Sequence, residues 1–206
     1  MNIRRVRSVA TAALALGLLL AACGSDETTQ KMLSGYVLDP APQVGDVTLP
    51  DASNGGADFH FTAPDGHFLL VYFGYLSCPD ICPTTLAEVR KAIGLLGDDG
   101  SKIDLAMITV DPNRDTDEMV TKYVQSFVPT AHGLRTDDPA ALQAAATAFG
   151  ASYEVVTNTD GSIDVSHSAV TYVVDASGAV VLSWPYGIKA QPMADDLSIL
   201  FDGIGA

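Results

Sequence analysis

Apolar runs alternate with helical patterns through the central part of the chain. Residues 67–75 open with His67 and are otherwise continuously apolar, and residues 103–110 are mostly apolar. Both runs are typical of strands that are buried on both faces of a sheet. Between them, residues 83–97 open with a proline, carry apolar side chains at helical spacing and end at a glycine. The pattern predicts a strand, a helix and a second strand in succession.

Three more helices are predicted further along the chain. Asp115, with Glu118 three residues later, is a capping-box-like start for the first of them. An Asp-Asp-Pro sequence opens the second, over residues 137–149, and residues 192–202 form an amphipathic helix.

Two turn sequences in the last third of the chain predict hairpins. Residues 158–161 and 176–178 are rich in Asn, Asp, Ser and Gly, and each separates two short apolar stretches. The predicted hairpin strands are 153–156 with 163–166, and 171–175 with 179–184. Alternating strands and helices that end in antiparallel hairpins predict an α/β fold: a central mixed sheet, helices on both faces and β-hairpin insertions.

The first 22 residues carry the three parts of a signal peptide. A basic start is followed by an apolar stretch, Val9 to Leu20, and then by Ala-Ala. A stretch of about a dozen residues is shorter than the roughly 20 that a membrane-spanning helix needs. We therefore expect residues 1–22 to be an export signal and not a permanent membrane anchor.

Cys23, directly after Leu-Ala-Ala, resembles the lipobox of bacterial lipoproteins. The resemblance implies cleavage before Cys23 and acylation of its thiol; an ordinary secretory signal with a neighbouring cysteine is the alternative. Residues 23–34 are largely polar and predict a flexible tether. Residues 35–206 then form one folded domain on the extracytoplasmic face of a bacterial membrane.

Composition narrows the class of partner. The chain has 11 Lys and Arg against 25 Asp and Glu, a formal net charge of −14, and 48% of its residues are hydrophobic. That hydrophobic content excludes a disordered chain. Nucleic-acid binding is excluded as well, because affinity for phosphate backbones comes mainly from Lys and Arg.

Cys78 and Cys82 are the thiols left once Cys23 carries lipid. They lie between a buried strand and a helix N-terminus, where the helix dipole favours a thiolate. Cysteines at i and i+4 on a helical turn have β-carbons about 5–6 Å apart, farther than the roughly 3.5–4.5 Å of a relaxed disulfide. Such a pair can hold a metal ion between its sulfurs, and it can still oxidise if Cys78 lies in the turn before the helix.

A metal ion would need a third ligand. His167 stands at the end of a predicted hairpin strand, whereas His60, His67 and His132 have no partner at ligand spacing. Taken alone, a histidine in that position is more often a hydrogen-bonded core or turn residue. It becomes a ligand only if the fold brings it to the two thiols.

Three separate segments are similar to signature blocks of the Sco/SenC family. They are Tyr75–Pro83 around the cysteines, Val110–Asp115, and Val165–Ser168 followed by Tyr172–Asp175, and their order and spacing are preserved. Members of that family are membrane-tethered copper proteins of thioredoxin-like fold that assist cytochrome c oxidase assembly. The resemblance implies the same fold and role for residues from about 36 to the C-terminus.

The resemblance also implies the roles of single residues. The family's copper ligands fall on Cys78, Cys82 and His167, a donor set that suits Cu(I) through the thiolates and Cu(II) through the imidazole. The family's acidic position falls on Asp111. Its carboxylate either supports the site or faces a partner, or it is a turn residue before Pro112.

Two functions remain open. The first is a metallochaperone, not an enzyme, that receives copper from an upstream donor and delivers it to the dinuclear copper site of a cytochrome c oxidase subunit. The alternative is a thiol–disulfide reductase in which Cys78 and Cys82 form the redox pair that acts on the oxidase cysteines or on other extracytoplasmic thiols. A peroxiredoxin-type peroxidase would need Pro and Thr where Val71 and Tyr75 stand, and a structural zinc site would need a fourth ligand.

Overall fold

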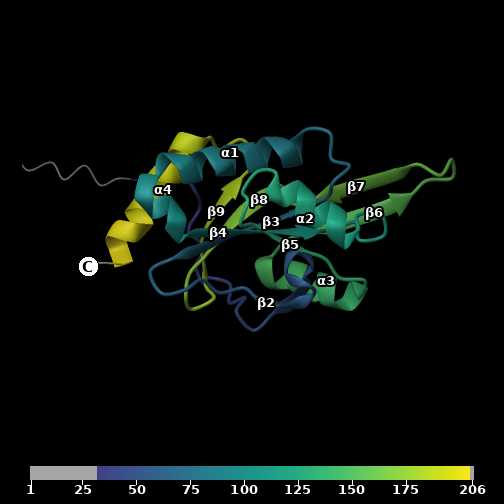
Figure 1. Ribbon diagram of the computed structural model, residues 1–206, viewed down its shortest axis with the longest axis horizontal. Coiled ribbons are helices and arrows are strands. Elements are labelled where there is room, and N and C mark those ends of the chain that lie inside the picture. Colours follow the sequence, from purple (N-terminus) through teal and green to yellow (C-terminus); the bar gives the residue numbers. More distant parts are fainter. Residues whose placement is uncertain (1–31, 205–206) are drawn as a thin grey trace, which may run out of the picture. The chain divides into compact units, whose positions relative to one another are not determined.

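A mixed sheet of seven strands forms the centre of the computed structural model, which describes residues 32–204 (Figure 1). The strand order is β2-β1-β5-β4-β3-β8-β9, and β6 and β7 form a separate two-stranded ribbon. The strands are β1 Thr48–Asp51, β2 Ala57–His60, β3 Phe68–Gly74, β4 Ile103–Thr109, β5 His132–Leu134, β6 Tyr153–Thr157, β7 Ile163–His167, β8 Val170–Val174 and β9 Val180–Pro185. Strands β3, β4 and β5 are parallel to one another, and the other pairs are antiparallel, which confirms the mixed sheet.

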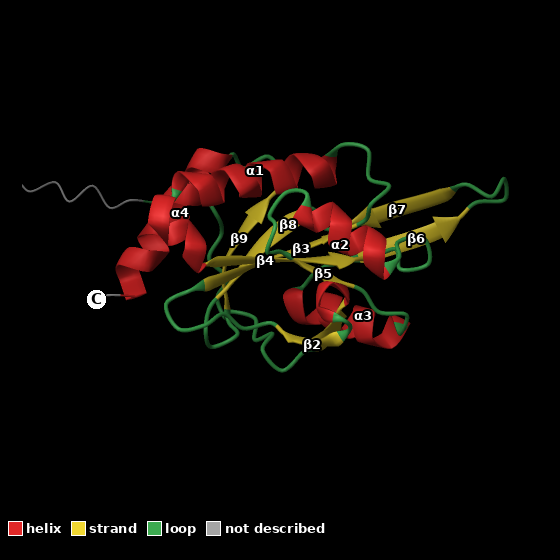
Figure 2. Ribbon diagram, viewed as in Figure 1, coloured by secondary structure: helices red, strands yellow, loops and turns green. Residues whose placement is uncertain are grey.

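Helices cover both faces of this sheet, as predicted (Figure 2). Helices α1 (Ile81–Leu95), α2 (Asp117–Gln125) and α4 (Ala190–Ile204) lie on one face, and α3 (Pro139–Phe149) lies on the other. Each face has its own apolar core: Leu86 of α1, Val124 of α2 and Leu197 of α4 belong to one, and Phe149 of α3 belongs to the other. Two short 3₁₀ helices, Ala52–Asn54 and Gly97–Lys102, complete the elements.

The two predicted central strands are β3 and β4, and they place the candidate chemistry. Every residue of β3 is buried, in agreement with its continuous apolar run. The strands pair in register from Phe68 with Ile103 to Gly74 with Thr109. Because they are parallel, the loops that follow them, with the two cysteines and with Asp111, leave the sheet at the same edge.

Helix α1 begins two residues earlier than its proline suggested. Asp80 is its N-cap residue, so Cys82 lies in the first helical turn and Pro83 is the third helical residue. A proline is tolerated there because the first N–H groups of a helix have no intrahelical acceptor. The earlier start joins Cys82 to the rigid helix and leaves Cys78 in the turn before it.

The predicted start of α2 at Asp115 was wrong. Its N-cap residue is Thr116, whose hydroxyl accepts a hydrogen bond from the backbone N–H of Met119. The side chain of Asp115 turns inward instead. The predicted start of α3 is confirmed, with Asp138 as the N-cap before Pro139.

Both predicted hairpins are present, as β6–β7 and β8–β9. The short strands β1, β2 and β5 were not predicted. The predicted signal peptide and Cys23 lie outside the described residues. Across residues 32–204, the structure has no helix with the length and apolar character needed to cross a membrane.

Candidate metal centre

Three elements bring Cys78, Cys82 and His167 together at the carboxyl end of β3. Cys78 lies in the loop after that strand, Cys82 in the first turn of α1, and His167 is the last residue of β7. Their ligand atoms all lie within 4.8 Å of one another, and Cys82 Sγ is 3.5 Å from His167 Nε2. In the part of the chain that the structure describes, no other group of three His, Cys, Asp or Glu side chains is arranged to hold a metal ion.

The two thiols are free and have unequal surroundings. Cys82 is completely buried, whereas Cys78 is half-buried. The backbone N–H of Cys82 donates a hydrogen bond to Cys78 Sγ over 3.3 Å. This N–H is one of the unpaired donors of the helix N-terminus, which favours negative charge on the sulfur of Cys78.

The acidities of the two thiols therefore diverge. Burial by itself would raise the pKa of Cys78, but hydrogen bonds from the Cys82 side chain and from backbone N–H groups of the helix start outweigh it and lower the pKa below its usual value. Burial, together with donation of its own proton to Cys78, raises the pKa of Cys82 to about 12. The pair thus has one thiolate-forming, accessible sulfur and one protonated, buried sulfur.

His167 is oriented with a free ring nitrogen toward the sulfurs. Its Nδ1 lies 3.1 Å from the carbonyl oxygen of Ser168, and only a protonated Nδ1 can donate to a carbonyl. Burial lowers the pKa of His167, so the ring is neutral near pH 7 and Nε2 carries a lone pair. The rings of Tyr72 and Tyr75 stand edge-on to the imidazole at 5.9 and 5.8 Å, which fixes its plane.

Gly74 is a site residue that the sequence reasoning missed. It ends β3, and a β-carbon at this position would lie 2.8 Å from Tyr72 Cε1 and 3.3 Å from Cys82 Sγ. The glycine leaves the space that the Cys82 sulfur and the Tyr72 ring occupy. A glycine at the end of a buried strand, just before a cysteine loop, was the available signal, because such glycines often allow close approach of neighbouring groups.

The donor set fits a three-coordinate metal ion. Metal–sulfur bonds of about 2.3 Å and metal–nitrogen bonds of about 2.0 Å in a planar trigonal arrangement place the ligand atoms roughly 3.7–4.0 Å apart. The distance from Cys82 Sγ to His167 Nε2, 3.5 Å, is slightly shorter than these values, and all three ligand atoms lie within 4.8 Å of one another. Only small side-chain movements are needed to close the three ligands around an ion.

Asp111 follows β4, the strand next to β3, and does not face outward. It is 2% exposed, and its carboxylate accepts a hydrogen bond from Arg114 Nε in an ion pair. Its backbone N–H donates to Thr109 Oγ1 over 3.1 Å. A partner protein would reach the carboxylate of Asp111 only after Arg114 moved, so the observed conformation favours a role inside the loop.

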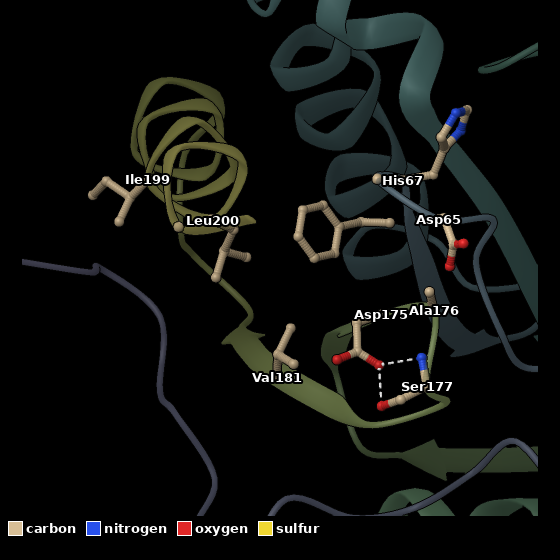
Figure 3. A pocket seen from close by; sticks show the side chains of 11 residues that line it. Asp65, His67, Asp175, Ala176, Ser177, Val181, Ile199 and Leu200 are labelled. Atoms are coloured by element: carbon tan, nitrogen blue, oxygen red, sulfur yellow. Dashed lines mark hydrogen bonds between the residues drawn. The ribbon is translucent and has the colours of Figure 1, made fainter. Parts of the chain in front are cut away.

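Two hollows differ in their relation to the centre. A groove of about 490 Å³ runs beside His167 along the ribbon and is lined by Ser152, Tyr153, Glu154, Ser166 and Ser168. A cavity of about 590 Å³ lies at the opposite end of β3, with Val181 and Leu200 along one side and Asp65 and His67 along the other (Figure 3). A seven-residue strand separates it from the cysteines by roughly 20 Å at about 3.3 Å per residue, so it is not part of the metal centre.

Comparison with known proteins identifies the family. Residues 45–202, more than half of the chain, match the family model described as SCO1/SenC. The chain belongs to the SCO1/SenC family. The resemblance found in the three sequence segments is thereby confirmed.

Individual members of the SCO1/SenC family agree with this assignment. The chain is 33% identical over 132 residues to the SCO2-like protein of Rickettsia prowazekii. The aligned part is 63% of this chain and 64% of that relative, slightly less than two thirds of the relative's length. The structure of Bradyrhizobium japonicum ScoI with copper bound is 31% identical, with a TM-score of 0.64, over 74% of this chain and 96% of that one. The solution structure of apo Sco1 from Thermus thermophilus is 30% identical, with a TM-score of 0.71, over 82% of this chain and 97% of that one. The thioredoxin-like fold is confirmed.

Proposed function

We propose that the protein binds one copper ion through Cys78, Cys82 and His167 and delivers it to the dinuclear copper site of cytochrome c oxidase. The observation that carries the proposal is the convergence of two thiols and a neutral imidazole, from three separate elements, within 4.8 Å. Sco structures with copper bound, such as that of Bradyrhizobium japonicum ScoI, support copper as the ion.

The chemistry of the donors supports both copper oxidation states. Thiolates are soft ligands that suit Cu(I), and an imidazole nitrogen suits Cu(II) as well. Cys78 provides a thiolate readily, and Cys82 releases its proton when the metal binds, since metal ligation replaces a thiol proton. The exposed side of Cys78 leaves a path by which a copper donor or acceptor reaches the ion.

The site of action in the cell is part of the proposal. A signal peptide over residues 1–22 would direct export and be removed, and a lipid on Cys23 with a tether to residue 34 would then hold the folded domain at the extracytoplasmic face of a membrane. We propose the copper-site subunit of the oxidase and an upstream copper donor as its partners there.

Copper titration tests the binding site. We expect one Cu(I) per chain in the detergent-extracted protein under anaerobic competition with a chelator, and loss of tight binding in Cys78→Ser and in Cys82→Ser. His60→Ala is the matched control, because His60 is exposed and lies outside the centre. Wild-type copper spectra in all of the site variants, including His167→Ala, would place the copper elsewhere.

A thiol–disulfide reductase is the second candidate, and the unequal cysteines favour it. An accessible thiol of lowered pKa beside a buried thiol of raised pKa is the arrangement of an attacking and a resolving cysteine. In that reaction the Cys78 thiolate attacks a target disulfide, one target sulfur leaves as a thiolate, and the other forms a mixed disulfide with Cys78. The Cys82 sulfur, after loss of its proton, then attacks Cys78 in the mixed disulfide, which releases the second target thiolate and leaves a Cys78–Cys82 disulfide. The reductase needs no imidazole.

A deletion strain separates the two functions. Low oxidase activity should be rescued by the wild-type protein and only poorly by His167→Ala at limiting copper, with added copper restoring part of it by mass action. Full rescue by His167→Ala, with normal loading of the oxidase copper site, would favour the reductase.

A further inference from the structure

Asp115 is buried beside the cysteine loop, residues 75–79 between β3 and the N-cap of α1, and does not cap helix α2. It is 1% exposed, and its Oδ2 accepts two hydrogen bonds: one from the backbone N–H of Leu76 over 3.1 Å and one from Thr109 Oγ1 over 2.6 Å. Its own carbonyl oxygen accepts a bond from Arg135 Nε over 2.6 Å. Both the side chain and the backbone of Asp115 are therefore held in place.

The bond to Leu76 joins the cysteine loop, residues 75–79, to the segment that follows β4. Gly74 is the last residue of β3 paired with β4, and Asp80 is the N-cap residue before α1. Among the described residues, the other hydrogen bonds of residues 75–79 run within the loop or to the start of α1: Cys78 N–H to the carbonyl of Tyr75, and Cys82 N–H to Cys78 Sγ. Leu76 thus fixes the turn that carries Cys78.

We propose that Asp115 is a positioning residue for the metal centre: by holding Leu76 against the end of β4, it sets the position of the Cys78 sulfur relative to Cys82 and His167. This inference rests on the proposed copper site, to which it adds a residue that touches no ligand atom.

The support of Asp115 comes from the central strand pair itself. Thr109 is the last residue of β4, is fully buried and pairs with Gly74. Its hydroxyl donates to Asp115 and accepts from the N–H of Asp111, so both acidic residues of this loop depend on it. The cysteine loop is therefore joined through Asp115 to the buried end of the central strand pair.

A buried carboxylate such as that of Asp115 has an unfavourable free energy of burial, which a link with only a structural role would not require. Burying a charged group is unfavourable unless it is paired or hydrogen-bonded, and the nearby guanidinium of Arg114 pairs with Asp111 instead. Burial accordingly raises the pKa of Asp115. The ionised carboxylate of Asp115 only accepts hydrogen bonds, and one of its oxygens can accept from both the Leu76 N–H and the Thr109 hydroxyl.

The test compares Asp115→Ala, which removes both hydrogen bonds, with Asp115→Asn, which keeps one acceptor oxygen. Asp196→Asn is the matched control: Asp196 is also 1% exposed, and its carboxylate accepts bonds from Trp184 Nε1 and the N–H groups of Ser34 and Gly35, at a different place in the fold. All measurements use the full chain extracted in detergent.

Two readouts are needed. In the metal-free protein, amide exchange of the peptide that contains Leu76 should accelerate in Asp115→Ala and stay near wild type in Asp196→Asn. In the copper-loaded protein, Asp115→Ala should lower Cu(I) affinity by about 10- to 100-fold, the usual effect of losing a group that supports a metal ligand, and should change the Cu(II)–thiolate absorption. Asp115→Asn should restore most of both properties, and Asp196→Asn should change only thermal stability.

The proposed role of Asp115 can still be tested if a variant does not fold or if the wild type binds no copper. If Asp115→Ala does not fold, Thr109→Val replaces it, since valine fills the same space without the hydroxyl, with Thr109→Ser as its rescue. Folded variants with wild-type copper affinity and spectrum would overturn the inference, even if Leu76 exchanged faster. If the wild type binds no copper, the proposed function fails, and Leu76 exchange together with the alkylation rate of Cys78 still shows whether Asp115 positions the loop.

Discussion

Replacing Gly74 by alanine should disturb the metal centre from within the core. The added β-carbon would lie 2.8 Å from Tyr72 Cε1, 3.1 Å from Met107 Cε and 3.3 Å from Cys82 Sγ. Ordinary van der Waals contacts lie near 3.5–4.0 Å, so the tyrosine ring must move the most and the Cys82 sulfur by a few tenths of an ångström. The flexible end of Met107 can give way, but Tyr72 is fully buried and cannot leave.

The magnitude follows from overpacking. Extra methyl groups in a well-packed core cost about 1–3 kcal/mol. At roughly 2–4 °C per kcal/mol for a domain of 150–250 residues, the melting temperature should fall by roughly 2–12 °C. Copper affinity should fall as well, because the Cys82 sulfur and the Tyr72 ring, which stands edge-on to His167, are displaced together.

Gly94→Ala is the control for the same chemical change. Gly94 lies within α1 and a β-carbon there has no neighbour within 4 Å, so alanine should stabilise the helix by roughly 0.5–1 kcal/mol and leave copper binding unchanged. Calorimetry and chelator competition measure both properties for each variant. Equal melting temperatures and copper affinities for Gly74→Ala and wild type would refute the contact argument.

Three further predictions concern the anchor, the imidazole and the thiols. Cys23→Ala should release or misprocess the protein, and intact-mass analysis of wild type that finds an unmodified Cys23 would contradict the anchor. His167→Ala should keep much of the Cu(I) affinity and lose Cu(II), which absorption spectra and competition assays check; equal loss of both ions would contradict the assigned roles. Because the pKa of Cys78 is lowered, its alkylation rate should rise and level off at a lower pH than that of an ordinary thiol, whose pKa is about 8.5. Cys82 should stay unreactive until the pH approaches its pKa of about 12. A single shared titration for both thiols would refute the asymmetry.

The central strands were predictable because burial on both faces leaves a strong signal. Every residue of β3 is buried, and its apolar run is uninterrupted. The cysteine pair was recognisable from spacing alone. His167 was different: it is 85 residues from Cys82 in the chain, and no local pattern reports a contact over that separation. Only the resemblance to a family placed the three residues together.

The misplaced helix start has a physical reason. Asp115 and Thr116 are both common N-cap residues, so the local sequence does not decide which side chain caps the helix and which turns inward. That choice depends on Thr109 and Leu76, which lie on other segments. Strands β1, β2 and β5 were missed because they have only three or four residues, too few for a periodic pattern, and β2 is largely exposed.

The three proposed ligands lie on elements of different kinds, and this determines which variant can distinguish delivery from reduction. Cys82 is buried in the first turn of α1, Cys78 lies in a turn that is joined to β4 through Asp115, and His167 ends a separate two-stranded ribbon. Both copper transfer and disulfide exchange begin at an accessible sulfur, and Cys78 is the accessible one, so replacing it abolishes both. In the proposed function the imidazole takes part in metal binding alone, since thiol exchange needs no ring nitrogen. A variant at His167 is therefore the perturbation at this centre that removes a proposed metal ligand and leaves the dithiol intact.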